Sequence, residues 1–379
     1  SHAASHPLDA TDGFNIARGI TPDGRVATFD SFGDNLIAGG SDTNGGSDVF
    51  TYERQSGDVA LISHIPGSAA TAGNHDSFTG QVSADGREVV FSSVATDLVA
   101  GFTTSSFRQG IFYQDRASGS TTLVTHAAGS TAAMPNNDCD CMQDAVSPDG
   151  SVVLFQSYAT NLVAGQVEPF RANELFMWHR ASDATTLVSH AAGHPKVAAN
   201  STSGNARFSA DGSTFTFQSA ASDLVTGETS GGGTFNIFLG DRSNGRLELV
   251  SHAAGSPTTT LNGSSDLGGV LSADGSYVVF ASLATDVVPG QVDTSTSTCP
   301  TCAPGTYDVF LWERATGAQR LLTHIPSSDV VTANGDGAPI AVSEDGTLVV
   351  FASTATNLTA GQSDSNGGPD IFVSQLPRG

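Results

Sequence analysis

SADGSYVVFASLATDVVPGQ (residues 272–291) and SEDGTLVVFASTATNLTAGQ (residues 343–362) are two copies of one pattern in this chain. Each copy contains an Asp-Gly pair, then a run rich in β-branched and aromatic residues, and then a glycine. Asp-Gly between two apolar runs is a two-residue hairpin signal, so each copy predicts two antiparallel strands. The chain contains six copies, 62, 64, 62, 63 and 71 residues apart, with the pairs at Asp23, Asp85, Asp149, Asp211, Asp274 and Asp345. Self-similarity of this kind predicts a repeat architecture.

Each repeat also contains a second predicted hairpin. A second apolar run follows a polar, glycine-rich loop, and after a tight turn comes a run that ends in Ser-His or Thr-His. Each full repeat therefore predicts four short antiparallel strands, and no segment carries a sustained helical period. Four strands at a regular step are typical of a propeller blade. The expected fold class is all-β, a six-bladed β-propeller of four-stranded antiparallel blades.

One domain is expected to span residues 1–379, because blades in a ring share their cores with their neighbours. The last repeat stops after its third strand, near Ser374, whereas residues 1–4 match the end of a fourth strand at 251–254. The N-terminal segment is therefore expected to complete the last blade and close the ring. The repeats lie near residues 17–64, 79–126, 143–190, 205–252, 268–324, and 339–374 plus 1–4.

The repeats resemble those of TolB-type, WD40-like bacterial propellers. The resemblance rests on SPDG at Ser147–Gly150 with the VVLF that follows it, and on the Asp-Arg and Glu-Arg pairs that close the third strand of a repeat. It spans essentially the whole chain and implies a propeller fold. Propellers of this kind serve as binding modules, scaffolds and enzyme domains, so the resemblance leaves the activity open.

The composition narrows the possible partners. The chain has 38 acidic and 15 basic residues, with a net charge of −23. Nucleic acids and anionic membranes require clustered basic charge, so both are excluded as expected partners. No apolar run approaches the roughly 18 residues of a membrane span, so no membrane insertion is expected. We expect a monomer in the bacterial periplasm or outside the cell.

Two sets of residues that could suggest a site are expected to be structural. One is the histidine at the end of each fourth strand, which recurs on the outer strand and so cannot converge with the others. A local hydrogen-bond role is expected for these rings. The other set is Trp178 and Trp312, which occupy strand positions and are expected to pack. The histidines are His2, His64, His126, His190, His252 and His324.

A ligand site is expected on the face that carries the long loops, with the central channel beside it. If the apolar residues Ile20, Val82, Val146, Phe208, Leu271 and Val342 point into the blades, the residues before them line the channel. That lining contains one polar sector, which is either plain water-filled lining or a means of orienting a ligand. The candidate ligand-binding residues of channel and loops are Arg18, Asp76, Gln81, Asp138, Gln143, Asn205 and Arg207.

The expected function is binding of a protein or carbohydrate ligand through this face. The chain has no nucleophile elbow, no H-E-x-x-H helix and no glycine-rich phosphate loop that opens a helix. Because residues from different blades can still form an active site, a metal-assisted hydrolase or lyase using the same face is the alternative. The sequence identifies no catalytic residue.

Calcium is a possible cofactor at two loops. Asp42, Asn44 and Asp48 in the first repeat match Asp364, Asn366 and Asp370 in the last. Oxygen ligands at alternate positions before a glycine resemble half of a calcium loop. The alternative is an Asx turn with a second aspartate that caps the next strand.

The four cysteines lie in two loops that break the repeat. In an oxidising compartment they predict two local disulfides, Cys139–Cys141 and Cys299–Cys302. Short loops gain little stability from cross-linking, so these bonds are expected to stiffen the loops. The alternative is Cu(I) binding, because Met134 and Met142 flank the first pair.

Overall fold

The computed structural model describes residues 11–102, 108–137, 139, 145–232, 234–265, 267–294 and 306–376. These residues form β-strands and no helix, which confirms the all-β class. Within this part of the chain there is accordingly no helix long and apolar enough to cross a membrane. The chain divides into two compact units, Ser1–Val188 with Lys196–Ala198 and Ser189–Pro195 with Ala199–Gly379. The expectation of one domain stays a prediction.

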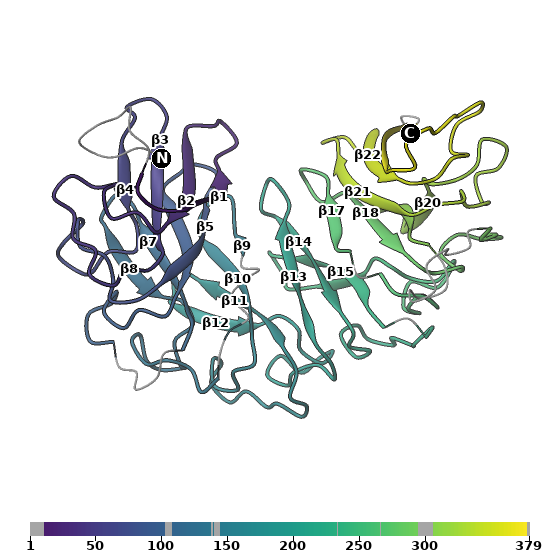
Figure 1. The fold of residues 1–379 in the computed structure, drawn as a ribbon. Helices are drawn as coiled ribbons and strands as arrows, with labels where there is room; N and C mark the ends of the chain where they lie inside the picture. The colour runs from purple at the N-terminus through teal and green to yellow at the C-terminus, as the bar shows by residue number, and fades with distance from the viewer. Residues whose placement is uncertain are drawn as a thin grey trace. The chain divides into compact units, whose positions relative to one another are not determined.

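The first unit contains three four-stranded antiparallel sheets (Figure 1). The first consists of β1 (Asn15–Ile20), β2 (Val26–Ser31), β3 (Asp48–Glu53) and β4 (Val59–Leu61). The second consists of β5 (Ser77–Val82), β6 (Glu88–Ser93), β7 (Gly110–Asp115) and β8 (Ser120–Leu123). The third consists of β9 (Ala145–Val146), β10 (Val152–Ser157), β11 (Glu174–His179) and β12 (Ala184–Leu187).

The second unit also contains three sheets. The fourth consists of β13 (Ser203–Phe208), β14 (Thr214–Ser219), β15 (Asn236–Asp241) and β16 (Leu247–Leu249). The fifth consists of β17 (Gly269–Leu271), β18 (Tyr277–Ser282), β19 (Asp308–Glu313) and β20 (Ala318–Leu321). The sixth has three strands among the described residues, β21 (Gly337–Val342), β22 (Leu348–Ser353) and β23 (Asp370–Gln375). Residues 1–4 lie outside the described residues, so ring closure stays a prediction.

One pair of phenylalanines crosses the two middle strands of every sheet. Phe155 on β10 lies opposite Phe176 on β11, with ring centroids 5.5 Å apart, and both rings are fully buried. Stacked aromatic pairs contribute about 0.5–1.5 kcal/mol beyond their buried area. The repeated aromatic position thus builds a core into each sheet. The other pairs are Phe29–Phe50, Phe91–Phe112, Phe217–Phe238, Phe280–Phe310 and Phe351–Phe372.

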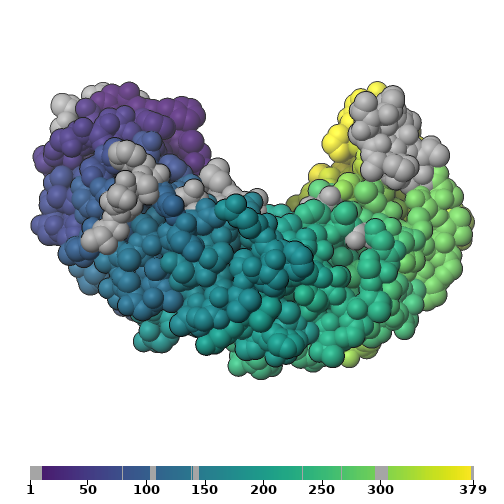
Figure 2. Space-filling view, turned by 90° about the horizontal axis from the view of Figure 1, so that it is seen from below, coloured from purple at the N-terminus to yellow at the C-terminus, as the bar shows by residue number. Residues whose placement is uncertain are grey.

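Neighbouring sheets within a unit pack face to face. Val278 and Phe280 on β18 join a core cluster with the fourth sheet, whereas Val279 between them joins the cluster shared with the sixth. This alternation follows from the two-residue period of a strand. In the space-filling view the colour passes smoothly from purple to blue through the first unit, so sheets that are consecutive in sequence are also neighbours in space (Figure 2).

Arginines that follow the third strand link adjacent sheets. Arg180 of the third sheet contacts Glu88 and Asp115 of the second, with N–O distances of 2.7 and 2.5 Å. Arg314 of the fifth sheet contacts Asp241 and Glu248 of the fourth in the same way. The arginines that follow the third strands of the third and fifth sheets are therefore clamps to the preceding sheet.

The first strands depart from simple alternation. The pairing of β1, β5, β13 and β21 with the next strand shifts register at a β-bulge. A bulge re-aims the side chains on either side of it. Val82 and Val342 still pack into cores, as predicted. Ile20 is 66% exposed, because the first sheet has no preceding sheet in its unit, so its expected place inside a blade stays a prediction.

Candidate functional site

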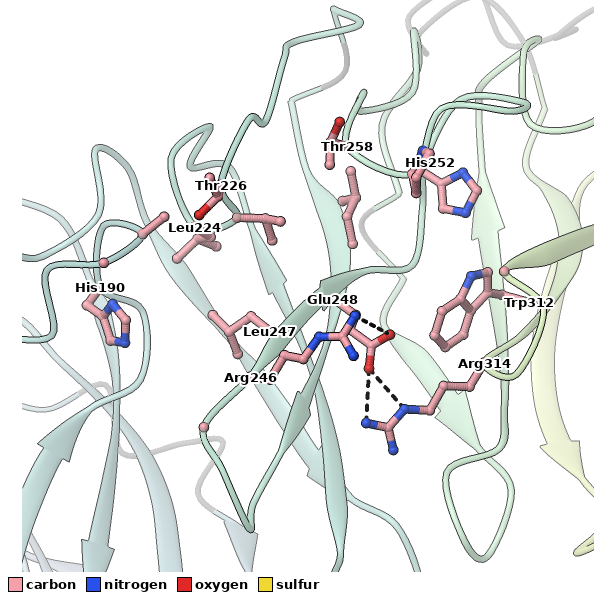
Figure 3. Close-up of a pocket in the computed structure, with 17 residues that line it drawn as sticks. His190, Leu224, Thr226, Arg246, Leu247, Glu248, His252, Thr258, Trp312 and Arg314 are labelled. Atoms are coloured by element: carbon pink, nitrogen blue, oxygen red, sulfur yellow. Dashed lines mark hydrogen bonds and ion pairs between the residues drawn. The ribbon is translucent and has the colours of Figure 1, made fainter.

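A cavity of about 510 Å³ lies in the second unit, beside β16 (Figure 3). Its walls come from five places: β16 with the turn before it, the segments after β12, β14 and β16, and the end of β19 with the turn after it. Ligand pockets usually measure roughly 300–1,000 Å³, so the size suits a small molecule or a short segment of chain. The lining includes His190, Leu224, Leu247, His252, Trp312 and Arg314.

The short strand β16 supplies the apolar wall and one charge. Leu247 and Leu249 both line the cavity, and Leu249 is almost fully buried. Glu248 between them faces Arg314, whose two nitrogens lie 2.9 and 3.0 Å from one carboxylate oxygen. Figure 3 shows this pair and a second contact from Arg246 to the same carboxylate, which measures 3.7 Å.

The charge of Arg314 is held in place by carboxylates. Burial by itself lowers the pKa of Arg314, but the carboxylates of Asp241 and Glu248 outweigh it and raise the pKa above its usual value. Hydrogen bonding to Ser243, together with Arg314, lowers the pKa of Asp241. Both partners therefore stay ionised, and the cavity is bordered by a largely neutralised set of charges.

Two buried polar atoms at the cavity have no hydrogen-bond partner within the described part of the chain. Trp312 is 3% exposed and His252 5% exposed, and both line the cavity. Among the described residues, no hydrogen-bond partner is present for Nε1 of Trp312 or for Nε2 of His252. Figure 3 shows the imidazole next to the indole on one side of the cavity. A buried polar atom without a partner is rare in proteins and requires an explanation.

The other nitrogen of His252 has a structural role. Nδ1 lies 3.0 Å from the carbonyl oxygen of Ala253, and it donates because a carbonyl only accepts. The other described histidines of the repeat make the same contact at 2.9–3.2 Å, which confirms the predicted local role. These are His64, His126, His190 and His324.

The loop after β14 borders the cavity, and the carboxyl group of Glu228 accepts a hydrogen bond from its backbone. Oε2 of Glu228 accepts a hydrogen bond of 3.1 Å from the backbone nitrogen of Val225, which lines the cavity. Burial raises the pKa of Glu228 to about 7. The third, fifth and sixth sheets have Gln166, Gln291 and Gln362 at this position.

The candidate ligand residues of the first unit make structural contacts. Nε of Arg18 pairs with the buried carboxylate of Asp30. Oδ1 of Asp76 accepts a hydrogen bond of 2.9 Å from the backbone nitrogen of Ser47, which ties the start of the second repeat to a loop of the first. Gln81 is exposed on β5.

The remaining candidates belong to the second unit or lie outside the described residues. Asn205 and Arg207 are exposed on β13, and Asn205 donates a hydrogen bond to Gln218. Asn205 also has a φ of 55°, so it occupies the left-handed region that few side chains adopt. Asp138 and Gln143 lie outside the described residues. The polar channel sector therefore stays a prediction, and it did not anticipate the cavity beside β16.

The two predicted calcium loops form Asx turns. Oδ1 of Asp42 accepts from the backbone nitrogens of Asn44 and Gly45, at 2.9 and 3.2 Å. Asp364 does the same with Asn366 and Gly367, at 2.9 and 3.0 Å. In the part of the chain that is described, no three His, Cys, Asp or Glu side chains could hold a metal ion together.

The strand-capping aspartates differ between the two loops. Burial raises the pKa of Asp48 to about 7, and its carboxylate accepts a hydrogen bond of 2.7 Å from Ser63. Asp370 at the matching place is exposed. Calcium binding stays a prediction, and a chelator that leaves the melting temperature unchanged would contradict it.

The predicted disulfides are not tested. Cys139 is disulfide-bonded and its side chain is buried in the core cluster of the second and third sheets. Its bonding partner lies outside the described residues, as do Cys141, Cys299 and Cys302. Both pairings and the copper alternative therefore stay predictions.

No family model matches this chain, and no curated protein matches it. Among solved structures it is similar to TolB from Acinetobacter baumannii, at 14% identity over 82% of this chain and 57% of that chain, with a TM-score of 0.35. It is similar to an oligogalacturonate lyase in complex with manganese, at 12% identity over 100% and 95% of the two chains, with a TM-score of 0.48. It is also similar to a putative TolB from Agrobacterium tumefaciens, at 13% identity over 97% and 92%, with a TM-score of 0.39.

The chain thus spans a little more than half the length of the Acinetobacter protein. At these identities and TM-scores, the similarities carry no conclusion about what this chain binds or does.

Proposed function

We propose that this protein is a binding module that takes its ligand in the cavity beside β16. The observation that carries the proposal is the cavity itself, which has about 510 Å³ of space, an apolar wall and two buried polar atoms without a described partner. Pockets with a mostly apolar lining and a few converging polar groups are the usual form of ligand sites. A periplasmic or extracellular location and a protein or carbohydrate ligand remain part of this proposal.

A tryptophan at the rim tests this function. Thr226 is exposed in the loop after β14 and lines the cavity, so Thr226→Trp would block it. Ala164 is exposed at the same position of the third repeat and provides the matched control, Ala164→Trp. We would screen acetylated tripeptides and mono- and disaccharides for a rise in melting temperature. Binding that Thr226→Trp abolishes and Ala164→Trp preserves supports the function, and equal binding to both variants contradicts it.

We further propose that the six sheets close into one propeller, with residues 1–4 completing the sixth. Support comes from apolar side chains that are exposed on the described sheets, since large exposed apolar patches usually mark an interface. Ile371 and Val373 on β23 are each 63% exposed, and Ile20 on β1 is 66% exposed. Deletion of residues 1–10 is then expected to lower the melting temperature of the whole chain by several degrees, and an unchanged value would contradict closure.

A further inference from the structure

The chain builds one arrangement of histidine and tryptophan twice. In the first unit, Nε1 of Trp178 on β11 donates a hydrogen bond of 2.9 Å to Oδ1 of Asp183. Nε2 of His126 lies 3.2 Å from the same oxygen. A single carboxylate oxygen thus joins the indole of the third sheet to the imidazole of the second.

The second unit has the same two rings and lacks the carboxylate. Trp312 occupies on β19 the position that Trp178 occupies on β11, and His252 corresponds to His126 in the repeat. The turn after β11 reads HRASDA (residues 179–184), and the turn after β19 reads ERATGA (residues 313–318). Gly317 therefore stands where Asp183 stands in the first unit.

The backbone at Gly317 could carry the missing side chain. Asp183 has a φ of 50° and Gly317 a φ of 67°, so both turns use the left-handed region, which aspartate tolerates better than most residues. A Cβ atom added to Gly317 would meet no heavy atom of another described residue within 4 Å. Gly317 itself lines the cavity. The space that the Asp183 side chain fills in one unit is thus open to the cavity in the other.

The donor chemistry defines what would complete this arrangement. The indole Nε1–H of Trp312 can only donate, so its partner must be an acceptor. In the first unit that acceptor is a carboxylate oxygen, and it lies between the indole and an imidazole nitrogen. A carboxylate at the cavity would accept from Nε1 of Trp312. It would also accept from Nε2 of His252 when the ring carries a proton on both nitrogens, because Nδ1 already donates to Ala253.

Resting on the proposed function, we infer that the cavity binds a ligand through a carboxylate group that takes the place of the Asp183 side chain. The indole and the imidazolium form of His252 donate to the carboxylate, and the apolar wall of Leu224, Leu247 and Pro257 receives the rest of the ligand. The carboxylate can belong to an acidic amino-acid side chain or to an acidic sugar. In both cases the recognised group is the same.

The tryptophans provide a direct assay, because the chain has only two. A ¹H–¹⁵N spectrum of the full chain shows one indole N–H resonance from Trp178 and one from Trp312, and Trp312→Phe assigns them. We expect N-acetylaspartate or glucuronate to shift the Trp312 resonance saturably and to leave the Trp178 resonance in place. N-acetylasparagine methyl ester and glucose are the uncharged controls, and we expect them to bind at least about tenfold more weakly.

Gly317→Asp provides the decisive variant. Without any ligand it is expected to move the Trp312 resonance toward that of Trp178 and to abolish the response to both carboxylates. Gly119→Asp, at the equivalent turn of the second sheet, is the matched control, because that sheet has Gln114 where the third and fifth have tryptophan, and Gly119 does not line the cavity. It is expected to leave the Trp312 response intact.

Which probe binds separates the two sources of the carboxylate. A response to N-acetylaspartate alone indicates a peptide ligand, and a response to glucuronate alone indicates an acidic glycan; either outcome supports the inference. An unmoved Trp312 resonance at saturating concentrations of both overturns it, and shows that an ordered water alone completes the site. If Thr226→Trp still abolishes the binding of another compound, the proposed function stands and only the carboxylate inference fails.

Discussion

The junction of the second and third sheets and the junction of the fourth and fifth sheets are built from matching residues, yet one is sealed and the other is open. In the first unit, Asp183 joins His126 and Trp178. In the second unit, Gly317 leaves the corresponding nitrogens of His252 and Trp312 beside a cavity, without a partner among the described residues. A single position in a turn thus separates a structural contact from a candidate site.

The arginine clamps of the two junctions differ as well. Arg180 reaches Glu88 on the second strand of its neighbouring sheet, and this carboxylate is 3% exposed. Arg314 reaches Glu248 on the outer strand β16, and this carboxylate is 15% exposed. The carboxylate of the open junction therefore lies closer to solvent, next to the cavity, whereas the arginine of the sealed junction is the more exposed of the two, at 39% against 27%.

The largest expected effect comes from breaking these clamps. Arg180→Ala leaves the buried carboxylate of Glu88 without its charged partner and is expected to lower the free energy of unfolding by about 3 kcal/mol. Arg314→Ala leaves a carboxylate that already lies closer to solvent, and is expected to lower it by about 1 kcal/mol. Urea unfolding of both variants measures the difference. Equal losses would show that the two clamps are not distinct.

Opening the sealed junction is the next largest effect. Asp183→Gly leaves the indole of Trp178 and the imidazole of His126 unpaired, and is expected to lower the free energy of unfolding by about 2 kcal/mol. Sodium acetate should restore part of this loss by filling the gap, whereas sodium chloride should not. Asp183→Asn keeps an acceptor oxygen and is expected to lose less. A variant as stable as the wild type would mean that the carboxylate contributes nothing there.

The loop that borders the open cavity adds a dependence on pH. In the third repeat, Nε2 of Gln166 donates a hydrogen bond of 2.9 Å to the carbonyl oxygen of Ala159, and its Oε1 accepts one from the backbone nitrogen of Val163. Glu228 accepts in the same way from Val225, but its Oε1 is buried and has no partner among the described residues. A carboxylate cannot donate as the amide does, so the protonated form suits this position better.

The sign of the pH effect follows from the two states of the chain. Burial raises the pKa of Glu228 from 4.5 to about 7 in the folded protein. The folded state therefore binds the proton more tightly than the unfolded state does. The stabilising contribution is complete below pH 4.5 and is lost as the pH rises through 7. After allowance for solvent screening it amounts to about 1–2 kcal/mol.

Glu228→Gln tests this dependence. The free energy of unfolding of this variant should not fall between pH 5 and 8. The variant should therefore be more stable than the wild type at pH 8. Urea unfolding at pH 5 and pH 8 gives the two differences, and Gln166→Glu should introduce the same dependence in the first unit. Parallel pH profiles for wild type and Glu228→Gln would contradict the assignment.

Closing the open junction should change stability least. Gly317→Asp gains two hydrogen bonds but places a side chain in the left-handed region, and these terms roughly cancel, so the net change is expected to stay within about 1 kcal/mol. The melting temperature of the unliganded protein measures it. A loss of several kcal/mol would show that the turn has no room for a carboxylate, which would remove the basis of the comparison.

Much of the fold was predictable because each signal acts locally. Asp-Gly pairs between apolar runs produced the first hairpin of every sheet, and the last repeat forms three strands among the described residues. The recurring Asp or Asn after the second strand is a cap: Oδ1 of Asp97 accepts from the backbone nitrogen of Asn74 at 2.9 Å. These roles depend on neighbours within one repeat or the next.

The candidate site was not predictable by the same reasoning. Trp312 was expected to pack, and its ring does. Whether its Nε1 has a hydrogen-bond partner depends on the turn after β19 in its own sheet and on a histidine from the previous sheet. The available signal was the difference between Asp183 and Gly317 at matching positions. It has meaning only once the structure shows that Asp183 contacts both rings.

The amino-acid sequence by itself determined the number of repeats, the order of strands within a sheet, the turns, and the alternation that places phenylalanines in each core. These depend on backbone preferences and on the two-residue alternation of side chains along a strand, both of which are visible in the sequence. Only the tertiary structure decided which turn faces which ring, where the bulges of the first strands re-aim side chains, and which sheet junction is left open. The physical reason is that a cavity arises between elements from different repeats, so its shape and its unpaired donors exist only after those repeats have packed together.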